Sequence, residues 1–203
     1  MSFSKFKQLP DVLKKYDLTL SEMIMPIFPE KQAPDFLKED LAFTLENMPY
    51  ACSEAAICEN LLHPILKTAW KEYAAILSIW SQAPLNASKE LSGVADYVIT
   101  KRSPLGRIVF DTPYLAVIEA KRDDFTGGWG QCAVEMLAIQ QLNGDVDLPV
   151  YGIVSNGEIW EFGQLEQQKL TLYKLRFDIV NLDSLFSALI YFLELCKKNI
   201  GKN

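Results

Sequence analysis

The chain has 203 residues, of which 49% are hydrophobic and 23% are charged. That is enough for one domain with a full hydrophobic core and hardly enough for two. Its formal net charge of −6 disfavours tight binding to phosphates without excluding a nucleic-acid enzyme. One histidine and four scattered cysteines, with no Cys-x-x-Cys pair, argue against a zinc site of the usual Cys/His type. We recognise neither a signal sequence nor an apolar run of membrane-spanning length, and so expect a cytoplasmic protein with no membrane partner.

The first part of the chain is expected to be mainly helical. Residues 35–47 carry apolar side chains at helical spacing, and we interpret residues 1–52 as a helical extension packed on the core. Ser53 is a good N-cap residue for the next helix. The helical pattern continues past Pro64, which can kink or restart the helix, and ends near Pro84.

Strands are expected to follow. The candidate strands are residues 92–101, 107–110 and 115–121, and the last is apolar enough to be a central, buried strand. Gly127-Gly128-Trp129-Gly130 is interpreted as a glycine-rich break before a helix over residues 131–142.

A hairpin and a helix are expected to close the chain. Asn156-Gly157 is a strong hairpin signal between strands at 150–155 and 158–162. A further strand lies near residues 171–177, and an amphipathic helix covers residues 182–197. The strand–helix–strand step from 115 to 154 predicts a parallel crossover. The expected fold class is therefore α/β, with a mixed central sheet flanked by helices in a single compact domain.

The strongest functional signal lies at the end of the third candidate strand. Residues i and i+2 of a strand share a face, so Glu119 and Lys121 point one way while Ile118 and Ala120 point into apolar surroundings. Asp96, on an earlier strand, can supply a second carboxylate. A solvent-facing ion pair at a strand end is the common alternative for an isolated Glu-x-Lys.

These residue types suit metal-assisted phosphodiester hydrolysis. Mg²⁺ or Mn²⁺ prefers oxygen ligands, which Asp96, Glu119 and the carbonyl group of Ala120 could provide. Lys121 could orient or deprotonate the attacking water, and a nearby cation would lower its pKa and favour the second role.

Asp96, Glu119-Ala120-Lys121 and the helix that begins at Gln131 resemble the PD-(D/E)XK nuclease superfamily, which has the restriction-endonuclease-like fold. The stretch from Ser53 to Trp70 is similar to the first core helix in the N-terminal nuclease domain of type I restriction subunits. The resemblance covers roughly residues 53–162. One departure is Ala95, which stands where the family commonly has proline.

The resemblance implies a metal-dependent nuclease that acts on DNA, with a restriction-endonuclease-like core over residues 53–203. It implies that a helical glutamate assists metal binding, with Glu54 as first choice and Glu59 as second, and that Gln131 contacts the site. Cleavage of both strands of a duplex would suit a homodimer.

Several residues are candidates for nucleic-acid contacts. Between residues 94 and 122 there are five basic and three acidic side chains. Lys101, Arg102, Arg107 and Arg122 could contact phosphates, although a solvated hairpin is the usual explanation for such a group. Trp129 could stack on a base, although a packing role is more common for such a residue.

Two other functions stay open at this point. The same fold could hold nucleic acid or a partner protein without turnover, which the acidic composition favours. An unrelated α/β protein with a chance Glu-x-Lys is the third possibility, and it predicts that Asp96 and Glu119 lie far apart.

Overall fold

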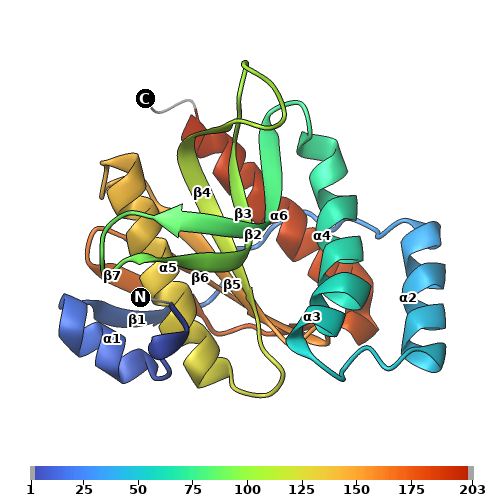
Figure 1. Cartoon of the computed structure of the whole chain (residues 1–203). Helices are drawn as coiled ribbons and strands as arrows, with labels where there is room; N and C mark the ends of the chain where they lie inside the picture. The colour runs from blue at the N-terminus through green and yellow to red at the C-terminus, as the bar shows by residue number, and fades with distance from the viewer. Residues whose placement is uncertain (1–2, 201–203) are drawn as a thin grey trace.

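A mixed eight-stranded sheet with helices on both faces forms the protein (Figure 1). The structure is a computed structural model that describes residues 3–200. The strands lie in the order β1-β7-β6-β5-β4-β3-β2, and the short β8 also pairs with β6. This arrangement confirms the predicted α/β class with a mixed sheet flanked by helices.

The elements have the following bounds. The strands are β1 Thr19–Met23, β2 Leu77–Asn86, β3 Ser92–Arg102, β4 Phe110–Ala120, β5 Val150–Ser155, β6 Ile159–Glu166, β7 Lys169–Tyr173 and β8 Phe177–Asp178. The α-helices are α1 Leu9–Tyr16, α2 Asp35–Asn47, α3 Glu54–Ile57, α4 His63–Trp70, α5 Phe125–Asn143 and α6 Leu182–Ile200. The short helical turns are η1 Phe3–Lys5, the π-helical η2 Cys58–Leu62, η3 Lys71–Tyr73 and η4 Ile179–Asn181.

The strand pairing places β4 in the interior of the sheet. It pairs antiparallel with β3 and parallel with β5, and α5 connects β4 to β5. The predicted parallel crossover is thus confirmed. The hairpin at Asn156-Gly157 is also confirmed, because β5 and β6 pair antiparallel around it and Gly157 has a φ of +89°. A positive φ favours glycine at this position.

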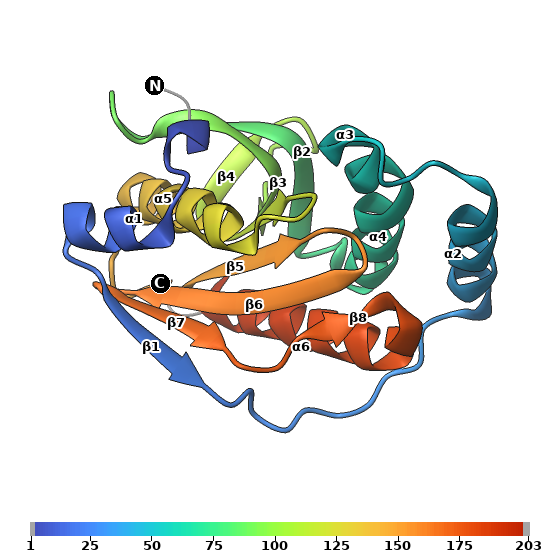
Figure 2. The same cartoon turned by 90° about the horizontal axis from the view of Figure 1, so that it is seen from below.

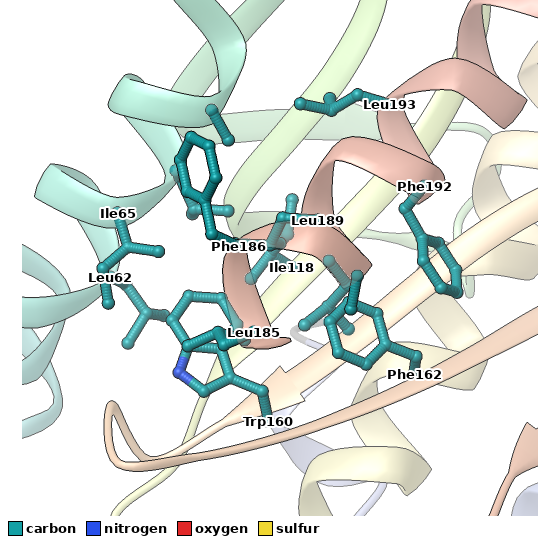
Figure 3. Packing of buried hydrophobic residues seen from close by; sticks show 14 of the residues in the cluster. Leu62, Ile65, Ile118, Trp160, Phe162, Leu185, Phe186, Leu189, Phe192 and Leu193 are labelled. Atoms are coloured by element: carbon teal, nitrogen blue, oxygen red, sulfur yellow. The ribbon is translucent and has the colours of Figure 1, made fainter. Parts of the chain in front are cut away.

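Two apolar layers cover the sheet. Figure 2 shows α1 and α5 on one side of β5 and β6, with α6 on the other. On the α6 side, Leu185, Phe186 and Leu189 of the helix lie against the sheet residues Ile118 and Phe162 (Figure 3). The side chains of β4 therefore alternate between two packed layers, which fixes the orientation of the strand.

Helix α6 is more apolar than the sequence analysis recognised. Together with η4 it forms the stretch Ile179–Ile200, which is long and apolar enough to cross a membrane by length and composition. Charged residues such as Asp183 and Glu194 interrupt the stretch, so no apolar run was apparent from the sequence. Its side chains Leu185, Phe186 and Leu189 are buried against the sheet, as in the core helix of a globular domain.

Strand β2 replaces the second half of a predicted helix. Helical structure ends at Tyr73, and Leu77–Asn86 pairs antiparallel with β3. The indole of Trp80 stacks on Phe110 and donates to Thr100 Oγ1 at 3.0 Å. Pairing across the sheet thus outweighs the helical spacing of the apolar residues. Pro84 is tolerated because β2 lies at an edge of the sheet.

Two other sequence predictions need correction. The segments 107–110 and 115–121 were predicted as separate strands, but β4 is continuous from Phe110 and residues 107–109 lie outside it. The first 52 residues are not only a helical layer, since β1 pairs parallel with β7 and extends the sheet. The predicted helix over residues 35–47 is confirmed as α2.

Replacement of Phe162 by alanine tests this packing. Phe162 is fully buried in the layer beneath α6, so Phe162→Ala should lower the free energy of unfolding by about 3–5 kcal/mol. Phe43→Ala is the matched control, because Phe43 on α2 is 63% exposed, and its effect should stay within about 0.5 kcal/mol. Urea unfolding followed by circular dichroism measures both. Equal effects of the two variants would contradict the proposed core.

Candidate functional site

The predicted carboxylate and amine lie together at the end of β4. Lys121 Nζ is 2.6 Å from Glu119 Oε1, so the two side chains share a face as expected. Glu119 is only 2% exposed. Ile118 and Ala120 point to the other face, into the apolar layer that contains α6. The pair is therefore a largely buried one, unlike the solvent-facing pair of the alternative interpretation.

Asp96 meets this pair from β3. Tyr97 pairs with Ile118, so Asp96 stands opposite Glu119 at the next position of the antiparallel register. Asp96 Oδ2 accepts a hydrogen bond from the backbone N–H of Ala120 at 2.9 Å, and Oδ1 accepts one from Gln82 Nε2 at 3.1 Å. These bonds fix the carboxylate beside β4. The third possibility predicted that Asp96 and Glu119 lie far apart, and the structure instead places them side by side.

Glu54 reaches the site from α3. Ser53 caps this helix as predicted, since its Oγ accepts from the N–H of Ala56 at 3.0 Å. The cap places Glu54 in the first turn, where its Oε1 is 3.6 Å from Lys121 Nζ. Of the two glutamates that were considered, Glu54 is thus the one that pairs with Lys121.

Helix α5 closes the site on its other side. It begins at Phe125, where Asp124 Oδ1 accepts from the N–H of Gly127 at 2.8 Å. The glycine-rich segment 127–130 is therefore helical, and the predicted break is wrong. A Cβ atom at Gly128 would lie 2.6 Å from Val154 Cγ1 and 3.0 Å from Lys121 Cγ. Glycine is needed here because the helix lies directly on β5 and on Lys121.

Trp129 has a structural role, so the prediction that it stacks on a base is wrong. The side chain is 3% exposed within the layer between α5 and the sheet. Its Nε1 donates to Glu161 Oε2 at 2.6 Å. The indole satisfies its polar group inside the protein and presents no free face to a ligand.

The basic residues predicted to contact phosphates lie in two separate parts of the structure. Lys101 and Arg102 lie at the far end of β3, about 16 Å and about 20 Å from Asp96 at roughly 3.3 Å per residue. Arg107 follows them in the connection between β3 and β4, and Arg102 Nη1 donates to the carbonyl of Ala74. These three residues are therefore not part of the carboxylate cluster. Arg122 is exposed directly after Lys121, beside the site.

Burial makes Glu119 an unusual acid. Burial, and then the charge of Asp96, raise the pKa of Glu119 to about 8, although Lys121 opposes the shift. The second oxygen of Glu119, Oε2, has no hydrogen-bond partner in the described part of the chain. A cation at this oxygen would favour the ionised form of the carboxylate.

Lys121 is held as an ammonium group. Burial alone would lower its pKa, but the charge and hydrogen bond of Glu119, followed by Glu54 and Asp96, raise it above the ordinary value. The predicted lowering of the pKa depended on a nearby cation. Without a cation, the neighbouring carboxylates keep Lys121 protonated. This favours a role in which Lys121 orients the attacking water and compensates negative charge over a role as a base.

Glu135 is a site residue that the sequence analysis missed. It lies on α5 and is 0% exposed, and burial, followed by the charge of Glu119, raises its pKa well above the usual value. Its Oε1 accepts a hydrogen bond from Gln131 Nε2 at 3.1 Å. The available signal was the four-residue spacing of Gln131 and Glu135, which places them on one face of a helix.

The fit of a divalent cation can be judged from the donors. Residues 3–200 contain no group of three or more His, Cys, Asp or Glu side chains placed to hold a metal ion together. A cation would therefore have two carboxylate ligands, Asp96 and Glu119, with the carbonyl of Ala120 and water completing the shell. Mg²⁺ commonly keeps several waters, and the unpartnered Glu119 Oε2 is a suitable ligand, so the residues fit this minimal site.

Comparisons of the chain with models of protein families and with curated proteins give no match. The functional argument therefore rests on the residues of the site and their geometry.

The close contact at Gly128 is testable. Alanine should lower the free energy of unfolding by about 1–3 kcal/mol because its Cβ would displace Val154 and Lys121. Helix propensity alone would favour alanine by about 1 kcal/mol, so a net loss reports the contact. Thr126→Ala, at an exposed position of the same helix, is the control and should change the free energy by less than about 0.5 kcal/mol. Gly128→Ala with wild-type or higher stability in urea unfolding would be evidence against the close approach of α5.

Proposed function

We propose that the protein is a Mg²⁺- or Mn²⁺-dependent nuclease that hydrolyses phosphodiester bonds in DNA. The observation that carries the proposal is the convergence of Asp96, Glu119 and Lys121 at the end of a buried strand. Glu54 joins them from α3, and Gln131 lies on the covering helix. The resemblance to the PD-(D/E)XK superfamily and its restriction-endonuclease-like core rests on the same residues, so it supports the proposal without being independent of it.

The chemistry follows from what each group can do. Phosphodiester hydrolysis needs a positioned water, compensation of charge at phosphorus and help for the leaving oxygen. A divalent cation at Asp96 and Glu119 would supply Lewis acidity and a more acidic bound water. Asp96 is already oriented by Ala120 and Gln82, so little reorganisation is needed to present its carboxylate.

The ammonium group of Lys121 complements the carboxylates. Glu119 and Glu54 hold it at 2.6 and 3.6 Å in the same site. A fixed positive charge beside the scissile phosphate stabilises the negative charge that develops in the transition state. As a donor of hydrogen bonds it also orients the attacking water.

Basic residues around the site bear on the proposed DNA substrate. Arg122 lies beside the site and is proposed to contact a phosphate next to the scissile bond. Lys101, Arg102 and Arg107 lie too far away for that, and would contact only a nucleic acid that extends along the sheet. We further propose a cytoplasmic location and a homodimer for cutting both strands of a duplex.

A binding module without turnover is the second candidate. The net charge of −6 and the lack of a three-residue metal group in residues 3–200 favour it. Such a module would hold nucleic acid or a partner protein, and it would not need a divalent cation at Asp96 and Glu119.

Cleavage assays with matched variants test the proposal. Wild type should cut single-stranded, double-stranded or branched DNA only with Mg²⁺ or Mn²⁺. Asp96→Ala and Lys121→Ala should each lower the rate about 100-fold or more, because each removes a group that meets the developing charge.

The controls are Glu39→Ala and Lys67→Ala, which remove the same charges from exposed positions of α2 and α4. Both should cut within about twofold of wild type. If folded wild-type protein cuts none of these substrates, or if Lys121→Ala cuts as fast as Lys67→Ala, the nuclease proposal is wrong. Metal-independent DNA binding without cleavage would favour the second candidate.

A further inference from the structure

One face of α5 is directed at the site. Gly128, Gln131 and Glu135 are spaced by three and four residues, so they follow one face of the helix. A Cβ at Gly128 would lie 3.0 Å from Lys121 Cγ, which shows that this face lies against the end of β4. Gln131 is half-buried and Glu135 is fully buried, so the polar side chains continue from the site into the interior.

Packing alone does not explain a buried glutamate at position 135. Its neighbours along the helix, such as Cys132 and Met136, belong to the apolar layer between α5 and the sheet. Its Oε2 has no hydrogen-bond partner among residues 3–200, which makes the group costly to bury. Within residues 3–200 the side chain of Glu135 is hydrogen-bonded by Gln131. A role of Glu135 beyond packing therefore acts through Gln131 or through the nearby carboxylates.

The hydrogen bond to Glu135 determines which end of the Gln131 side-chain amide, NH₂ or carbonyl oxygen, faces Glu135. Glu135 Oε1 is an acceptor in the carboxylate, and also in the acid form with the proton on Oε2. In the structure Oε1 accepts from the NH₂ end of the Gln131 amide, at 3.1 Å. The carbonyl oxygen of the Gln131 amide is then directed away from Glu135. Glu135 lies one helical turn further along α5 and is fully buried, whereas Gln131 is half-buried.

We propose that Glu135 is a positioning residue that holds Gln131 with its carbonyl oxygen presented to the site as a hydrogen-bond acceptor. The inference rests on the proposed nuclease function, because the acceptor is assigned to the attacking water. Lys121 as an ammonium group only donates hydrogen bonds. A water that donates one O–H to Gln131 and accepts a bond from Lys121 has its remaining lone pair fixed in direction.

Kinetics of two variants at Glu135 test the proposal. Glu135→Gln can offer either end of its amide to Gln131, and Glu135→Met offers no acceptor of comparable strength. Both should lower kcat about tenfold and leave KM within twofold, because substrate contacts stay in place. Thermal unfolding should show that neither variant is less stable than the control Gln140→Ala. Gln140 is a buried glutamine further along α5 that bonds to the carbonyls of Val146 and Gln167, and its variant should keep wild-type kcat.

A double-mutant cycle separates positioning from a general structural effect. If Glu135 acts through Gln131, Glu135→Gln should lower kcat tenfold in the wild type and less than twofold in Gln131→Ala. Equal losses in the two backgrounds, or wild-type kcat in both Glu135 variants, would overturn the inference and leave the nuclease proposal intact. Failure of the wild type to cut DNA marks failure of the proposed function itself and overturns the inference with it.

Hydrogen exchange of the Gln131 side-chain amide tests the positioning role without measuring activity. The side-chain NH₂ of Gln131 should give slowly exchanging NMR signals in the wild type and fast-exchanging signals in Glu135→Met. Fast exchange in both proteins would contradict the positioning role.

Discussion

The ion pair between Glu119 and Lys121 is the constraint on which the arrangement of the site depends. Removing two charged groups from water costs several kcal/mol for each ion, and their mutual attraction repays this only in good geometry. The 2.6 Å separation supplies that geometry, and Glu54 adds a second carboxylate near the amine. Glu119 still has one unpartnered oxygen, so the described residues do not fully satisfy the buried charge. A site in this state is suited to accept a cation or a proton.

The fold holds this pair on rigid elements. β4 is buried on both faces, with Ile118 in the layer beneath α6 and Val117 in the layer beneath α5. Its neighbour β3 presents Asp96, and Gly128 allows α5 to cover Lys121 closely. Side chains placed on strands and helices in this way are positioned more accurately than side chains on loops.

The sequence predicted those parts of the structure that depend on local rules. Strand alternation predicted the shared face of Glu119 and Lys121, and the cap at Ser53 and the turn at Asn156-Gly157 are local as well. The errors arose where contacts distant in sequence decide the outcome. Pairing with β3 makes Leu77–Asn86 a strand, and the close contact of Gly128 with Val154 of β5 occurs within a helix where a break was predicted. Glu135 was missed because its importance comes from burial, which a single sequence does not show.

The central claim is that Asp96 and Glu119 together form a divalent-metal centre. Anomalous diffraction from crystals grown with Mn²⁺ tests it most directly, with crystals of Glu119→Gln as the control. The account predicts an anomalous peak at bonding distance from Asp96 and Glu119 Oε2 in the wild type, and a much weaker peak in the variant. A wild-type peak located elsewhere, or equal peaks in both crystals, would contradict the account.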